Sequence, residues 1–109
     1  MSTLVERLRA QLGGPRDGAL LRFSLGNALL AAGDPAAAAG AFQDALGFDP
    51  GYSAAWKLLG RAHEQAGDTA AALHAFERGI EAAAARGDEQ ARKEMQVFLR
   101  RVRKRLAAD

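Results

Sequence analysis

The chain has 109 residues, 49% of which are hydrophobic. This length is sufficient for a domain with one hydrophobic core, and we do not expect a second domain. It contains no cysteine, which excludes disulfides, thiolate nucleophiles and cysteine-ligated zinc. The net charge of +2 is unevenly placed: residues 1–85 carry 7 basic and 9 acidic side chains, whereas residues 86–109 carry 8 basic and 4 acidic ones. The positive charge therefore lies in the C-terminal segment.

The first residues do not form a signal peptide, because Glu6, Arg7 and Arg9 interrupt the short apolar run of Leu4 and Val5. No stretch approaches the roughly 20 apolar residues that a membrane-spanning helix requires. We therefore expect a soluble, cytoplasmic protein that does not associate with a membrane.

Six helices account for nearly the whole chain, because apolar residues recur at helical spacing and strand-like alternation is missing. A repeated Gly-Asp pair marks their ends: Gly33 and Gly67 suit the position just past a helix, and Asp34 and Asp68 suit the N-cap of the next one. Pro35 then occupies the first helical turn, where its missing N–H costs nothing. In chain order, the expected helices cover residues 4–12, about 17–33, about 34–48, about 52–66, 69 to about 85 and 88 to about 106.

Residues 19–52 and 53–86 are two copies of one 34-residue unit, aligned without a gap. The identical pairs are Leu25/Leu59, Gly26/Gly60, Ala28/Ala62, Ala32/Ala66, Gly33/Gly67, Asp34/Asp68, Ala36/Ala70, Ala37/Ala71, Ala38/Ala72, Ala41/Ala75 and Phe42/Phe76. A fixed period of this length is typical of stacked helix pairs that bury their apolar faces against neighbours. We therefore expect one all-α domain, an antiparallel helix-pair solenoid, with residues 1–16 as an N-terminal helix and linker and residues 87–109 as a C-terminal capping helix.

The repeated glycines and phenylalanines predict how the helices pack. Gly26 and Gly60 lie in the middle of helices, where glycine costs up to about 1 kcal/mol relative to alanine, so close helix packing is the expected compensation. Phe42 and Phe76 are the expected core anchors. The last helix carries an apolar stripe that the rest of the chain or a second copy has to cover: Ala91, Met95, Phe98, Val102 and Leu106.

The sequence contains no arrangement of residues that indicates catalysis, a metal site or a cofactor. His63 and His74 are on different predicted helices and lack the spacing of metal-binding histidine motifs. Ser24 and Ser53 have no adjacent histidine that would activate a nucleophile. The glycine-rich loop at 13–18 lacks the Lys-Ser/Thr pair of a phosphate-binding loop, so we interpret it as a linker.

The repeated residues resemble the pattern of the tetratricopeptide repeat family, and the resemblance covers residues 19–86. The matching positions are Leu25, Gly26, Ala38, Phe42, Ala45 and Pro50 in the first unit and Trp56, Leu59, Gly60, Ala72 and Phe76 in the second. Arg22 replaces a large apolar residue of the family pattern, and Leu29 and His63 replace an aromatic one. Ala84 replaces the closing proline, which predicts that this helix continues further or turns differently into the last helix. We interpret the chain as a two-repeat member with an extra helix at each end.

The resemblance implies a non-catalytic adaptor or scaffold that binds another protein or a peptide in a concave groove, lined by the first helix of each repeat. The groove positions hold Leu20, Phe23, Asn27 and Leu30 in the first repeat and Ala54, Lys57, Arg61 and Glu64 in the second. We expect Phe23 and Leu30 to contact apolar side chains and Asn27 to bind a peptide backbone. Arg61 or Lys57 would bind a carboxylate, so an apolar half of the groove lies beside a charged half.

Two alternatives concern this groove. Some members of the family bind the tails of heat-shock chaperones through a carboxylate clamp, and Asn27 matches it. Phe23 and Leu58 stand where the clamp has a lysine and an asparagine, so we do not expect that activity. In the second alternative the first helix folds back over the apolar half and fills it with Leu4, Leu8 or Leu12.

Five basic residues form the densest charge cluster of the chain: Arg100, Arg101, Arg103, Lys104 and Arg105. Basic side chains near a helix C-terminus complement the helix dipole. The cluster spreads around the helix and has no aromatic residue interleaved to stack bases, so we favour a solvated face over a contact with nucleic acid or another anion. We expect a monomer or a weak homodimer, with self-association through the last helix as the alternative function.

Overall fold

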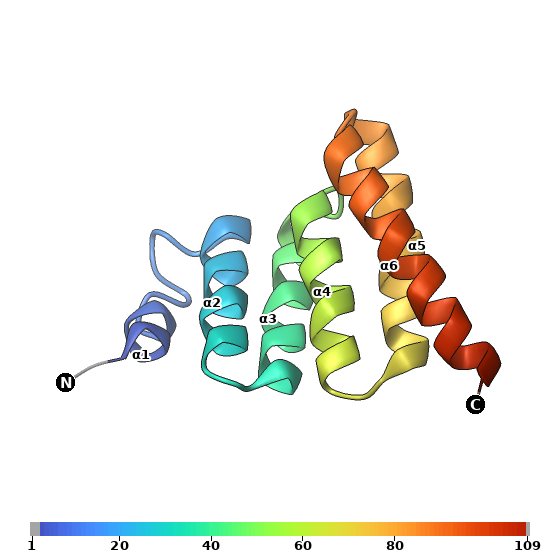
Figure 1. Ribbon diagram of the computed structural model, residues 1–109. Helices are drawn as coiled ribbons and strands as arrows, with labels where there is room; N and C mark the ends of the chain where they lie inside the picture. Colours follow the sequence, from blue (N-terminus) through green and yellow to red (C-terminus); the bar gives the residue numbers. More distant parts are fainter. Residues whose placement is uncertain (1–2, 109) are drawn as a thin grey trace.

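The computed structural model describes residues 3–108, and every element in that range is a helix, which confirms the all-α prediction. The helices follow one another along the molecule in chain order, with α1 and α6 at opposite ends (Figure 1). They are α1 (Leu4–Arg9), α2 (Ala19–Ala31), α3 (Pro35–Phe48), α4 (Ser53–Gln65), α5 (Thr69–Arg86) and α6 (Glu89–Ala108).

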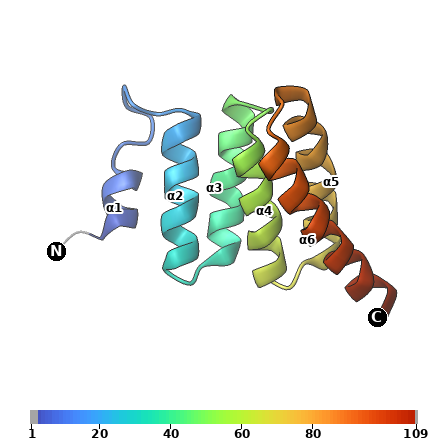
Figure 2. The same ribbon diagram turned by 45° about the horizontal axis from the view of Figure 1, so that its top comes forward.

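The helices form antiparallel pairs arranged in two layers. Helix α2 packs on α3, α4 on α5, and α6 on α5, while α3 also packs on α4 and joins the two pairs. The views of Figures 1 and 2 agree that α4 lies in front of α3 and α6 in front of α5. The backbones of α2 and α4, and those of α4 and α6, approach each other closely, whereas the backbones of α3 and α5 do not in the described part of the chain. The more closely spaced layer of a curved array is its inner one, so α2, α4 and α6 form the concave face.

The Gly-Asp pairs end and begin helices as predicted. Gly33 and Gly67 have φ values of 82° and 83°, a left-handed conformation that glycine adopts without steric cost. Asp34 and Asp68 each accept a hydrogen bond at 3.1 Å from the backbone N–H three residues further on. Both satisfy N–H groups that have no partner within the helix.

The linker before α2 differs from the prediction. Helix α2 begins at Ala19 and not near Asp17, because the Asp17 carboxylate turns back to accept a hydrogen bond at 2.8 Å from the N–H of Gly13. The same carboxylate pairs with the guanidinium of Arg22 at 2.8 Å. The hydrogen bond from Arg22 holds the pKa of Asp17 far below its usual range and raises that of Arg22. Helix α1 also ends earlier than expected, at Arg9, and tighter turns continue from it.

Helix α5 confirms the consequence predicted from the missing proline. In the first repeat α3 has 14 residues and ends at Phe48, two residues before Pro50. In the second repeat Ala84 permits the helix to continue, and α5 has 18 residues and ends at Arg86. Gly87, with φ 75°, then turns the chain into α6. Helix α6 therefore meets α4 at a sequence offset longer than the 34-residue repeat.

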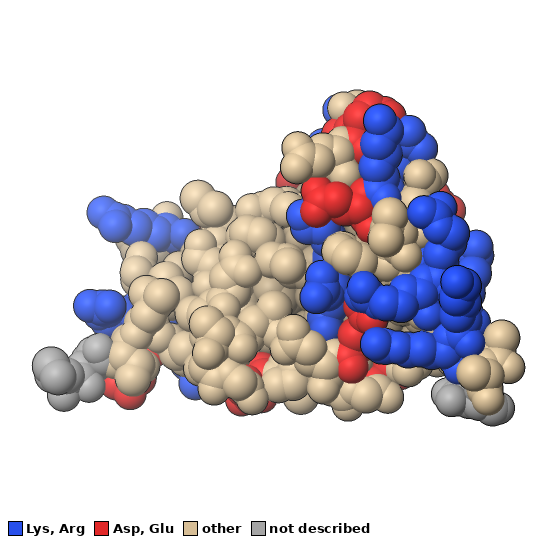
Figure 3. Space-filling model, viewed as in Figure 1, with Lys and Arg blue, Asp and Glu red and all other residues tan. Residues whose placement is uncertain are grey.

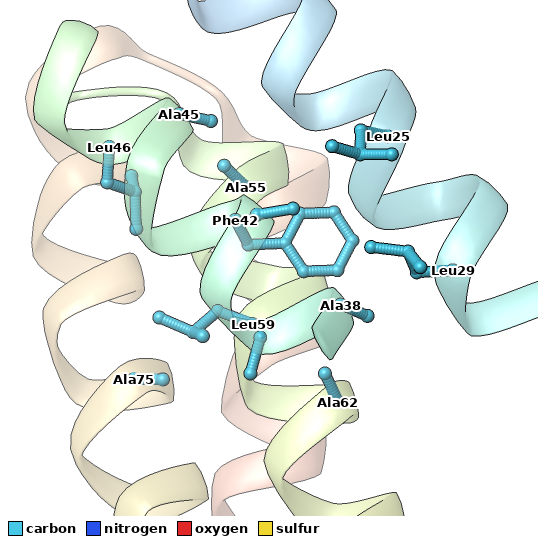
Figure 4. Packing of buried hydrophobic residues seen from close by; sticks show 12 residues of the cluster. Leu25, Leu29, Ala38, Phe42, Ala45, Leu46, Ala55, Leu59, Ala62 and Ala75 are labelled. Atoms are coloured by element: carbon cyan, nitrogen blue, oxygen red, sulfur yellow. The ribbon is translucent and has the colours of Figure 1, made fainter. Parts of the chain in front are cut away.

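Each repeat is built around one phenylalanine and one glycine. Phe42 and Phe76 are fully buried, and a methyl group on Gly26 or Gly60 would overlap the ring of the phenylalanine in the same repeat. Figure 4 shows the ring of Phe42 pointing from α3 towards Leu25 and Leu29 of α2. The absent side chain of the glycine is therefore what admits the ring between the two helices, as the sequence predicted.

The apolar stripe of α6 is covered within the chain. Met95 and Val102 are fully buried in the core cluster that α5 and α6 share, and Phe98 is partly buried there. Leu99, which the sequence analysis did not include, is also buried, whereas Leu106 is 37% exposed and ends the stripe. This packing removes the reason for expecting self-association through α6.

Helix α1 closes the other end more loosely. None of its residues is buried, and among the described helices it contacts only α2. Val5, Leu8 and Leu12 are partly buried against the core cluster of the first repeat, while Leu4 is 53% exposed. In the described part of the chain, no helix is both long enough and apolar enough to cross a membrane.

Candidate functional site

The concave face formed by α2, α4 and α6 has two halves of different character. Figure 3 shows a broad uncharged surface on the side of α2 and a dense group of Lys and Arg side chains over α6. Acidic side chains lie among these basic ones (Figure 3). The groove positions predicted from the sequence fall on α2 and α4, so the two halves can be examined residue by residue.

The uncharged half combines exposed residues with partly buried ones. Leu20 is 70% exposed and Asn27 is exposed as well, so both are accessible to a partner. Phe23 and Leu30 are only partly exposed, because they pack against the core cluster of the first repeat. Leu20 is not covered by α1, which lies beside α2 at the end of the array (Figures 1 and 2). The first helix therefore extends the array and does not fold over this residue.

Tyr52, which the sequence analysis did not single out, packs on one of the predicted binding residues, Phe23. Its ring stacks on that of Phe23, with centroids 4.9 Å apart and an interplanar angle of 26°, and Phe23 also meets Phe42 at 5.8 Å. Burial raises the pKa of the Tyr52 hydroxyl. The available sequence signal was an aromatic residue at the end of the first repeat, directly before α4, but its pairing with Phe23 joins the two ends of that repeat, 29 residues apart in the chain.

In the charged half, α6 pairs with the predicted binding residues of α4. Lys57 lies 3.3 Å from Glu94 of α6, so its ammonium group already has a carboxylate partner in the chain. Ala54, also on α4, is partly buried. The sequence analysis treated Lys57 as available to a ligand because it placed no acidic residue of α6 opposite it.

Glu64 is the centre of the charged half. Its side chain is only 7% exposed, although it lies near the end of α4. Arg101 donates hydrogen bonds to both of its carboxylate oxygens at 3.0 and 3.1 Å, and Arg105 donates one at 3.3 Å. Arg61 approaches the same carboxylate at 3.6 Å. We call Arg61, Arg101 and Arg105 the arginine triad.

The arginine triad lies against an aromatic ring and lines a shallow cavity. The guanidinium carbons of Arg61 and Arg101 are 4.7 and 5.1 Å from the centroid of the Phe98 ring, within the range of cation–π attraction. The triad, Glu64 and Gln65 line a cavity of about 300 Å³. Two elements thus position the site: α4 contributes the buried carboxylate, and α6 contributes the ring and two of the cations.

The basic cluster of the last helix does not act as one patch. Arg101 and Arg105 face α4, whereas Arg103 pairs with Glu77 of α5 at 3.6 Å. Arg100 and Lys104 are exposed. The cluster is therefore divided among different faces of α6, and three of its five residues form ion pairs within the chain.

The two histidines that the sequence analysis set aside line a cleft away from the concave face, and Ser53 has a structural partner. His63 and His74 line a cleft of about 610 Å³ between α3, α4 and α5, on the convex side. Within residues 3–108, no group of three or more potential ligands could hold a metal ion. Ser53 donates a hydrogen bond at 2.7 Å to Asp88, the residue before α6. This bond, together with one from the N–H of Ala91, lowers the pKa of Asp88.

Comparison with known proteins places these features in a family. The tetratricopeptide repeat family model matches residues 23–89. The chain is 50% identical to TPR repeat-containing protein PA0015 of Pseudomonas aeruginosa over 99 residues, which is 91% of this chain and 94% of the relative. The solution structure of protein BPP2914 from Bordetella parapertussis matches with a TM-score of 0.84 and 45% identity, covering 100% of this chain and 95% of that one. A tetratricopeptide repeat domain protein from Salinibacter ruber matches with a TM-score of 0.73 and 25% identity over 81% of this chain and 88% of its own.

Proposed function

Because this chain belongs to the tetratricopeptide repeat family, we propose that it is a non-catalytic adaptor that binds another protein or a peptide on the concave face of α2, α4 and α6. Tetratricopeptide repeats generally mediate protein–protein interaction. The observation that carries the proposal is the concave face itself, which presents an exposed leucine, Leu20, and an exposed amide, Asn27, beside a cationic end. We also propose that the protein acts in the cytoplasm.

The uncharged half suits recognition of an extended segment. The Leu20 side chain provides apolar area, and the amide of Asn27 has both donors and an acceptor for a peptide backbone. Beneath them, the stacked rings of Phe23 and Tyr52 hold the surface in one conformation. A preorganised surface loses less entropy on binding than a flexible one does.

The proposal is tested by comparing partners captured by the wild-type protein and by a Leu20→Glu, Asn27→Lys variant. Both side chains are exposed, so the variant should keep its helical circular dichroism spectrum and lose the partner. The matched control is Gln43→Lys, His74→Glu on the convex side, where both residues are also exposed. A partner lost by the control and kept by the concave variant would contradict the proposal.

A further inference from the structure

We infer that the arginine triad binds a side-chain carboxylate of the partner, so that the segment recognised by the concave face joins apolar residues to Asp or Glu. This inference rests on the proposed function and names the chemical class of the ligand. The charge count supports it directly. Three guanidinium groups surround a single carboxylate, Glu64, which leaves two positive charges in excess at this end of the face.

The triad also has unused hydrogen-bonding capacity. Three guanidinium groups carry about fifteen N–H donors. In the described part of the chain they donate three hydrogen bonds to Glu64. The side chains of Arg61, Arg101 and Arg105 remain 40%, 42% and 53% exposed, while Glu64 is 7% exposed. The carboxylate of Glu64, the only one that lines this cavity of about 300 Å³, is thus already bound by the arginines. The guanidinium N–H groups that do not contact Glu64 are left to face solvent.

Glu64 gives the triad its geometry. Three arginines repel one another, and the buried carboxylate offsets this repulsion while it fixes Arg101 through both of its oxygens. The Phe98 ring supports two of the guanidinium planes. A carboxylate that binds here meets cations already in position, which reduces the cost of ordering long side chains.

The surroundings favour an acidic peptide over another polyanion. The uncharged surface continues from the triad across α2, where nothing would neutralise a chain of phosphates (Figure 3). Phe98 lies against two guanidinium groups and is not arranged as a platform for bases. A segment with an acidic residue at one end and apolar residues along the rest matches both halves of the face.

The test is selection from a library of random dodecamers displayed on phage, followed by affinity measurements on the selected peptides. The displayed segment has no free C-terminus, and the synthetic peptides are amidated, so any carboxylate they offer belongs to a side chain. We expect the selected sequences to combine apolar residues with Asp or Glu. The Arg101→Gln, Arg105→Gln variant should bind them at least about tenfold more weakly.

The matched control is Arg100→Gln, Lys104→Gln, which removes the same charge from the same helix at positions on its other faces. Circular dichroism checks that both variants fold. The inference is overturned if the control loses affinity equally, because net charge alone would then explain binding, or if duplex DNA binds more tightly than the peptides. Selected peptides that lack Asp and Glu but depend on Leu20 would overturn the inference and leave the proposed function standing. No selected peptide at all would overturn both.

Discussion

The two repeats have nearly the same interior and very different surfaces. In each, a mid-helix glycine admits the ring of a fully buried phenylalanine, Phe42 in the first repeat and Phe76 in the second. Among the positions proposed to bind a partner, Leu20 and Asn27 of the first repeat are exposed, whereas Lys57, Arg61 and Glu64 of the second contact residues of α6. Identity between the repeats is therefore concentrated in the residues that pack the helices together and in the Gly-Asp pairs that end and begin them. The surface is where the two repeats differ and where recognition is proposed.

The largest expected effect tests whether the two interiors are equivalent. Phe42→Ala and Phe76→Ala should each lower the free energy of unfolding by about 3–5 kcal/mol, because each removes a fully buried ring and leaves a cavity. Urea denaturation followed by circular dichroism measures both. Loss of the cooperative transition in either variant agrees with the expectation; wild-type stability in one of them would show that the repeats are not equivalent.

A smaller effect concerns the glycines that accept those rings. Gly26→Ala and Gly60→Ala should each destabilise the protein by about 1–3 kcal/mol, because the new methyl group overlaps a phenylalanine ring. Gly40→Ala in α3 is the control, since nothing lies within 4 Å of the position of its Cβ. It should stabilise by up to about 1 kcal/mol through helix propensity. Thermal unfolding measures the three variants, and the packing argument would be refuted if all three midpoint temperatures shifted in the same direction.

Acid should weaken the fold through two ion pairs, one between the linker and the first repeat and one between the two repeats. Arg22 lowers the pKa of Asp17, and Arg86 lowers that of Asp49. A carboxylate with a lower pKa in the folded state stabilises the fold above the ordinary Asp pKa of about 3.9, and the stabilisation is lost as the pH falls from there through the folded-state pKa. The free energy of unfolding, measured by denaturation, should therefore fall as the pH is lowered from about 5 to about 2. Asp17→Asn should flatten that dependence, and an unchanged slope would exclude Asp17 as a contributor.

The smallest expected effect is that of a partly exposed ion pair between the second repeat and α6. Lys57 and Glu94 lie 3.3 Å apart, with side chains 25% and 39% exposed. A double-mutant cycle to alanine should give a coupling energy of about 0.2–1 kcal/mol, falling with added salt. A coupling of zero at low salt would mean that this ion pair does not help to hold α6 against α4.

The sequence was informative about the fold because many of the repeated residues either pack in the interior or mark the ends of the helices. A glycine and an aromatic residue at fixed positions in two copies predict the same helix pair twice, and Gly-Asp pairs predict the turns. The beginning of α2 was misplaced because Asp17 serves the preceding linker and Arg22 instead of capping the helix. Both partners lie within five residues of Asp17, but the fold of the linker that brings Gly13 to this carboxylate is irregular and is not indicated by the helical pattern.

The site was less predictable because it depends on how far α5 continues. Glu64 and Arg101 are 37 residues apart, as are Lys57 and Glu94, and the 34-residue period does not suggest that offset. The 37-residue offset arises because Ala84 allows α5 to continue to Arg86, and the length of α5 sets the register of α6 against α4. The sequence identified the basic cluster as a feature of α6. It did not indicate that Arg101 and Arg105 would face α4.

The central claim is that the concave face is the binding surface, and photocrosslinking tests it most directly. A benzophenone amino acid is introduced in place of Leu20 on the concave side or His74 on the convex side, both exposed positions, and the captured partner is irradiated in complex with each protein. We predict a covalent adduct from position 20 and none from position 74. An adduct from position 74 alone would contradict the account and move the binding surface to the cleft between α3 and α5.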